Sequence, residues 1–139
     1  MRRLSVLLLL VACSSSTPQN PYRPTVTAQQ LNLMNFGATT SAPITIEVHV
    51  TNKHTQPITL RRVRLEGGLS QQYQVTPADR ALNDVIPPGE SRSFRLSMTA
   101  YSQQGRIQDP EPLNLRGFVT YLVGEQQYED LYIFRTMMQ

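Results

Sequence analysis

The sequence predicts an all-β protein, an antiparallel β-sandwich of about seven short strands that follows an N-terminal export signal and a polar linker. Apolar residues recur at every second position in several segments, which is the period of a half-buried strand. Ten prolines and seven glycines separate these segments with turns. No stretch repeats apolar residues at the helical period, and 139 residues suit a single domain.

The chain begins with MRRLSVLLLLVACSSST, in which two arginines and a short apolar run precede a cysteine. The run at residues 4–12 is too short for a membrane-spanning helix, which needs roughly 20 apolar residues. A charged start, a short apolar region and a small residue are typical of an export signal. Leu10-Val11-Ala12-Cys13 resembles the lipobox of bacterial lipoproteins. The resemblance implies cleavage after Ala12 and acylation of Cys13.

Two or three acyl chains on Cys13 would anchor the protein stably to a membrane. In lipoproteins of bacteria with two membranes, Ser14 in place of an aspartate after the cysteine implies the outer membrane, with the protein facing the periplasm. An ordinary secretory signal with an unrelated cysteine is the alternative. We therefore expect a signal peptide at residues 1–12, a lipidated cysteine and flexible tether at 13–27, and a sandwich domain at 28–139.

Each expected strand has its own local signal. In ITIEVHV (44–50) four aliphatic residues alternate with polar ones, and SFRLSMTA (93–100) repeats the scheme. In ITLRRVRLEG (58–67) the apolar parity switches, which predicts a β-bulge near Arg61 and Arg62. Gly117 within LNLRGFVTYLV indicates either a bulge or a crowded neighbour. The remaining expected strands are QQLNLMNF (29–36), QQYQVT (71–76) and QYEDLYIFR (127–135), whereas PADRALND (77–84) is expected to form a single turn at most.

The last expected strand is apolar on both parities. It is either buried on both faces, which we expect, or leaves one face to meet a partner. Seven short strands with turns at regular spacing are typical of an immunoglobulin/fibronectin-III-like sandwich. The chain has one cysteine and no tryptophan, so it lacks the disulfide and buried indole of an antibody-type domain.

Within residues 44–123 the sequence resembles the WHy domain, the water-stress branch of the late-embryogenesis-abundant family. The resemblance rests on Asn52 and the proline-containing turn in VHVTNKHTQPITLRRVRLEG, on VIPPGESRSFRLSM, and on the glycine-containing strand LRGFVTYLV. Asn52 is followed by Lys53 where the family has proline. Fibronectin-type and other extracellular sandwiches also use a proline-glycine turn before a strand.

The sequence contains few groups that suit catalysis or metal binding, so we expect no enzyme activity and no cofactor. His49 and His54 are the only histidines, and with Glu47 they would form at most a weak surface metal site. We expect no resident metal. No serine sits in a GxSxG turn, and neither GxxxxGK nor GxGxxG occurs.

The net charge of +3 derives largely from Arg2 and Arg3, which would leave with the signal. The remaining chain is nearly neutral, which argues against nucleic-acid binding. Five arginines could form a positive strip on neighbouring strands and contact an acidic partner or anionic headgroups. Alternatively, they lie on a solvated face with acidic partners, which we favour. These residues are Arg61, Arg62, Arg64, Arg92 and Arg95.

Three functions remain open at this point. The first is a lipid-anchored, non-catalytic module that binds another cell-envelope component, and strand addition to a sheet edge is physically available to it. The second is a WHy-like stress-protective protein without a specific site. The third is a weak metal or ligand binder that uses the region around His49.

Overall fold

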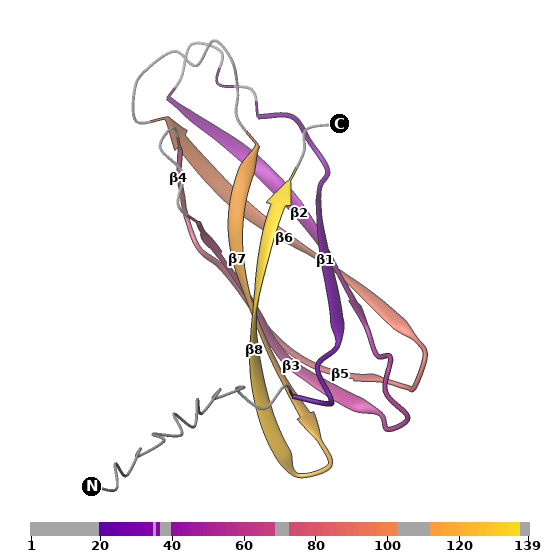
Figure 1. Cartoon of the computed structure of the whole chain (residues 1–139). Helices are drawn as coiled ribbons and strands as arrows, with labels where there is room; N and C mark the ends of the chain where they lie inside the picture. Colours follow the sequence, from indigo (N-terminus) through magenta and orange to yellow (C-terminus); the bar gives the residue numbers. More distant parts are fainter. Residues whose placement is uncertain (1–19, 35, 37–39, 69–72, 103–111, 137–139) are drawn as a thin grey trace, which may run out of the picture.

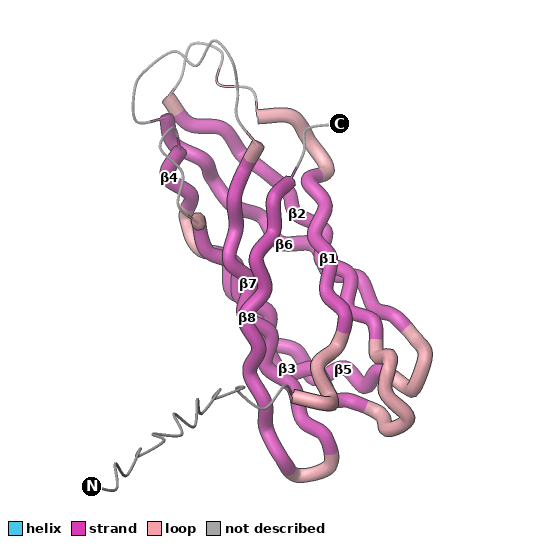
Figure 2. Tube along the Cα trace, in the orientation of Figure 1, coloured by secondary structure: helices cyan, strands magenta, loops and turns pink. Residues whose placement is uncertain are grey.

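The computed structural model describes residues 20–34, 36, 40–68, 73–102 and 112–136. These residues form strands and loops and contain no helix (Figure 2). The elongated domain is built from two four-stranded sheets, whose orders are β1-β2-β6-β4 and β5-β3-β7-β8, and all pairings are antiparallel (Figure 1). The predicted all-β, immunoglobulin-like sandwich is confirmed, with eight strands in place of about seven. The strands are β1 (Thr25–Gln30), β2 (Ser41–Thr51), β3 (Ile58–Gly67), β4 (Tyr73–Val75), β5 (Ala78–Ile86), β6 (Ser91–Ser102), β7 (Leu113–Val123) and β8 (Gln126–Thr136).

The core lies between the sheets and follows the period-two pattern of the longer strands. In β2 the inward side chains Ile44, Ile46, Val48 and Val50 are all buried. Their neighbours point outward because successive strand residues face opposite sides of a sheet. The register of β3 against both of its partners shifts between Leu60 and Arg62, so the predicted bulge is confirmed.

Gly117 accommodates a crowded neighbour, which is the second of the two predicted explanations. Its pairings with Leu65 and Tyr132 continue the regular register of β7. A Cβ at this position would overlap the Phe134 ring on β8 and lie 3.3 Å from a Leu65 methyl carbon. Gly117 therefore leaves room for Phe134 to fill the core.

Two expected elements are wrong. Residues 77–84 belong largely to the strand β5, whose buried side chains are only those of Ala78 and Ile86 at its ends. This edge strand is specified by its pairing with β3 and has little apolar alternation of its own. The expected strand at 29–36 is replaced by β1, and Leu31 and Leu33 are exposed beyond its end.

The domain also begins earlier than the expected boundary at residue 28. Strand β1 starts at Thr25, pairs with β2 and buries Val26 and Gln30. The lipobox-like segment and residues 13–19 of the expected tether lie outside the described residues, whereas residues 25–27 of that tether belong to β1. Among the residues that are described, no helix is long and apolar enough to cross a membrane.

Candidate functional site

The five predicted basic residues do not form one strip. Arg61, Arg62 and Arg64 lie on β3, whereas Arg92 and Arg95 lie on β6 in the other sheet. A single strip would require β3 and β6 to be neighbours in one sheet, and they are not.

Each of these arginines contacts a polar or acidic neighbour, and three of these neighbours are glutamates. Exposed ion pairs of this kind contribute little to stability and keep a sheet face soluble. The contacts are Arg61–Asn83 at 2.6 Å, Arg62–Asp79, Arg64–Glu66 at 3.3 Å, Arg92–Glu90 at 3.0 Å and Arg95–Glu47 at 3.2 Å. The hydrogen bond from Arg62 holds the pKa of the Asp79 carboxyl below its ordinary value.

The two histidines have different neighbours. His49 lies 3.3 Å from Glu47 and hydrogen-bonds to Ser93 at 2.7 Å, all on the outer face of β2 and β6. His54 lies in the turn after β2 and packs edge-on against Tyr22, with ring centroids 4.6 Å apart. Within the described ranges, no three His, Cys, Asp or Glu side chains are grouped to hold a metal ion.

Asn52 joins two turns at one end of the sandwich. Its buried side chain donates to the backbone carbonyls of Gln56 (2.7 Å) and Ile86 (3.0 Å) and accepts from the His54 amide (3.0 Å). Its backbone exchanges two further hydrogen bonds with the proline-glycine turn at residues 87–90, at 2.8 and 3.0 Å. Asn52 and this turn, two of the segments that carry the sequence resemblance, are therefore in direct contact.

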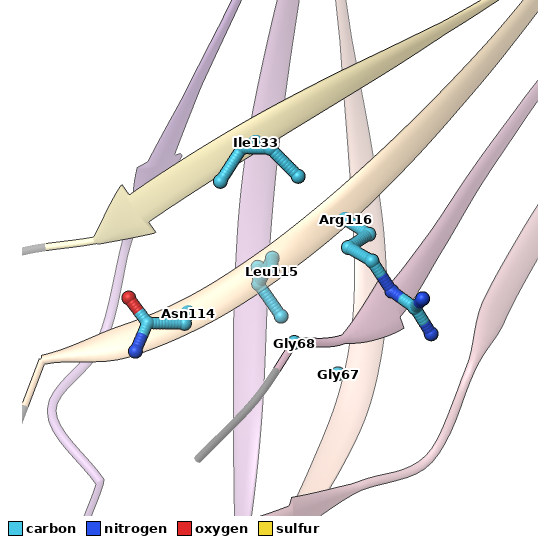
Figure 3. Close-up of a pocket in the computed structure, with 6 residues that line it drawn as sticks. All are labelled: Gly67, Gly68, Asn114, Leu115, Arg116 and Ile133. Atoms are coloured by element: carbon cyan, nitrogen blue, oxygen red, sulfur yellow. The ribbon is translucent and has the colours of Figure 1, made fainter.

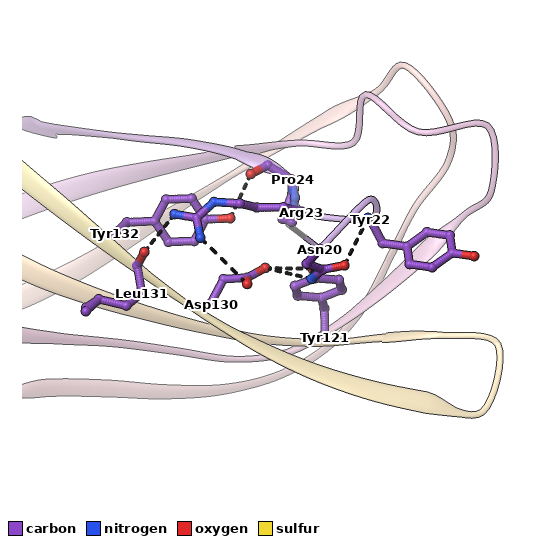
Figure 4. Close-up of polar contacts among 8 residues, drawn as sticks. All are labelled: Asn20, Tyr22, Arg23, Pro24, Tyr121, Asp130, Leu131 and Tyr132. Carbon is purple, nitrogen blue, oxygen red and sulfur yellow. Dashed lines mark hydrogen bonds and ion pairs between the residues drawn. The ribbon is translucent and has the colours of Figure 1, made fainter. Parts of the chain in front are cut away.

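The segment before β1, residues 20–24, lies against β7 and β8, and we call it the N-terminal strap (Figure 4). Asn20 donates to the Tyr121 hydroxyl (2.6 Å) and to Asp130 (3.2 Å), and Tyr121 in turn donates to Asp130 (2.7 Å). Burial, reinforced by the hydrogen bond to Asp130, raises the pKa of Tyr121 well above its ordinary value. This polar cluster fixes where the chain enters the domain.

Arg23 and Pro24 complete the contact of the strap with β8. The Arg23 guanidinium donates to the Leu131 carbonyl at 2.7 Å and lies over the Tyr132 ring, 4.2 Å from its centroid. The Tyr132 hydroxyl donates to the Pro24 carbonyl at 2.7 Å. Burial raises the pKa of Tyr132. The strap thus occupies part of the outer backbone edge of β8.

The outer face of β7 and β8 carries the most exposed apolar side chains of the two strands. Tyr132 and Phe134 point into the core, whereas Leu131 is 45% exposed and Ile133 is 71% exposed. The expectation that this strand is buried on both faces is therefore wrong, and one face is open to solvent. Leu131 pairs with Phe118 in the β7–β8 register, so the apolar surface continues onto β7.

A groove of about 420 Å³ lies next to Ile133 on this face (Figure 3). We call it the outer groove, and its lining comes from the end of β3 and from β7 and β8. The lining residues are Gly67, Gly68, Asn114, Leu115, Arg116 and Ile133. Sequence reasoning named none of them as site residues. The only signal for this face was the apolar character of the last strand on both parities.

Solved structures of other proteins are similar to this chain in fold. No protein-family model matches the sequence, and no curated protein matches it significantly. The structure is similar to the GAE domain of GGA2p from Saccharomyces cerevisiae, with 19% identity over 84% of this chain and 91% of that one and a TM-score of 0.50. It is also similar to the putative ApaA protein from Bordetella pertussis, with 16% identity over 84% and 95% of the two chains and a TM-score of 0.53. At these identities the likeness establishes the β-sandwich fold of the chain.

Proposed function

We propose that this protein is a lipid-anchored, non-catalytic component of the bacterial cell envelope whose sandwich domain binds another envelope component. The observation that carries the proposal is the exposed apolar pair Leu131 and Ile133 beside the outer groove. Single exposed apolar residues are common, but an apolar strand face next to a concave surface is typical of an interaction site. Scaffolds of this kind carry function in such surface sites.

The lipobox supports the anchoring part of the proposal. Cys13 lies seven residues before Asn20, where the strap meets β7 and β8. Even fully extended, the chain between them spans at most about 25 Å. A domain anchored through Cys13 would therefore stay close to the membrane surface, within reach of other envelope proteins.

Fractionation of bacterial cells tests the anchor. Wild-type chain is expected in the membrane fraction, and Cys13→Ser is expected in the soluble fraction because it removes the acylated sulfur. Retention of the variant in the membrane would contradict the anchoring.

Crosslinking in native membranes, followed by mass spectrometry, tests the binding function. A reproducible envelope protein is expected with the wild type and is expected to be lost in Ile133→Asp. Val85→Asp is the matched control, because Val85 is 51% exposed on β5, the opposite edge strand of the same sheet. Absence of any such partner, or equal loss in both variants, would contradict the function.

A further inference from the structure

The outer groove has a shape that suits a side chain of a docked segment. Two glycines at the end of β3 form one side of it, and Ile133 of β8 forms the other (Figure 3). The Gly68 amide donates to the Asn114 carbonyl at 2.8 Å, and a Cβ at Gly68 would lie only 3.0 Å from that oxygen. Because Gly68 has no side chain, the end of β3 can approach β7 closely and no side chain projects into the outer groove at this position.

Among the described residues beside the outer groove, two arginines contact the same glutamate. Arg116 lines the groove and lies next to Ile133 in the β7–β8 register. It shares a single carboxylate, Glu66, with Arg64, and both guanidinium–carboxylate distances are 3.3 Å. Arg64 also lies over the Phe118 ring, 4.5 Å from its centroid. Because Glu66 is divided between two guanidinium groups, Arg116 has N–H donors left that can pair with an incoming carboxylate.

The strap directs the partner to the face of β8 and away from its edge. Strand addition needs the outer carbonyl and amide groups of an edge strand. The Leu131 carbonyl already accepts a hydrogen bond from Arg23, so the edge is occupied at that point. The neighbouring side chains of Leu131 and Ile133 remain exposed on the outer face.

We propose that the outer groove binds an extended segment of a partner protein in which an apolar side chain is flanked by acidic residues. The apolar side chain packs against Ile133 and Leu131, and a carboxylate pairs with Arg116. This inference rests on the proposed function and specifies the chemistry of the partner. A concave groove whose described lining contains one arginine suits such a segment better than an anionic membrane, which is recognised by clusters of basic residues.

Fluorescence anisotropy with short labelled peptides tests this chemistry on the full chain in detergent. The first peptide alternates leucine and glutamate, the second leucine and lysine, and the third serine and glutamate. Only the first is expected to bind measurably, and its affinity is expected to fall as salt is raised because exposed ion pairs are screened. Equal binding of the lysine or serine peptide, or no binding of the first, would overturn the inference.

Three variants locate the binding. Ile133→Ser and Arg116→Gln are each expected to weaken binding roughly tenfold, because each removes one of the two contacts. Val85→Ser should leave the affinity unchanged, and all three should retain the wild-type unfolding midpoint because the replaced side chains are on the surface. Unchanged affinity in the first two variants would overturn the inference. So would binding to phosphatidylglycerol vesicles, reduced by Arg116→Gln, in place of peptide binding.

The experiments distinguish a failure of the proposed peptide chemistry from a failure of the proposed function. A crosslinked envelope partner without binding of the leucine–glutamate peptide overturns the peptide chemistry alone. Binding of that peptide without any envelope partner in native membranes overturns the proposed function.

Discussion

Asn52 offers the sharpest test of how the sandwich is held together. Replacing it with alanine removes three side-chain hydrogen bonds, two to backbone carbonyls and one from the His54 amide. A typical hydrogen bond contributes roughly 0.5–1.5 kcal/mol to stability, and a buried group left without a partner costs more. The Ile86 carbonyl is such a buried group. We therefore expect Asn52→Ala to lower the free energy of unfolding by about 2–4 kcal/mol.

Urea unfolding of the full chain in detergent, followed by far-ultraviolet circular dichroism, measures this loss. The slope of the free energy of unfolding against urea concentration should be the same as in the wild type, because the same surface is exposed on unfolding. Asn52→Asp should cost at least as much, since it keeps the acceptor for His54 but directs a carboxylate at two carbonyl oxygens. Asn83→Ala is the control, because Asn83 makes only an exposed contact with Arg61, and its cost should stay within about 0.5 kcal/mol. A loss below about 1 kcal/mol in Asn52→Ala would refute the reasoning.

Two further predictions concern the core. Gly117→Ala should destabilise the domain by roughly 1–3 kcal/mol, because the new methyl group would overlap the Phe134 ring and crowd Leu65. A cost near zero in urea unfolding would contradict the tight approach of β7 and β8. The raised pKa values of Tyr121 and Tyr132 predict loss of stability in alkali. Both tyrosines are neutral in either state below about pH 10, so their contribution is then fully present. Above that pH the tyrosines ionise in the unfolded chain before they ionise in the folded one. Each tyrosine then lowers the free energy of unfolding by at most about 1.4 kcal/mol per pH unit. A Tyr132→Phe variant should show a shallower decline between pH 10 and 12, and identical profiles would contradict the burial of this phenol.

The strands that alternate strongly could be predicted from the sequence because alternation records burial directly. The four aliphatic residues of β2 and the parity switch at Arg61 and Arg62 are examples, and both match the structure. Strand β5 could not be found in this way. Its middle is polar and lies at a sheet edge, so its conformation depends on pairing with β3.

The candidate site was less predictable than the fold. A run of sequence does not say which strands are neighbours, and the basic residues of β3 and β6 prove to lie in different sheets. The apolar residues on both parities of β8 favoured burial on both faces, and only the packing of the folded chain shows that Ile133 is left open. The outer groove needs the end of β3 beside β7, a contact that no local pattern encodes.

Site-specific photo-crosslinking in living cells tests the central claim most directly. A photoreactive amino acid is placed at residue 133 beside the outer groove, and at residue 85 on the opposite edge of the same sheet. We predict one reproducible envelope-protein adduct from position 133, none from position 85, and loss of the adduct when Arg116→Gln is added. No adduct from position 133, or the same adducts from both positions, would contradict the claim that this face binds an envelope partner.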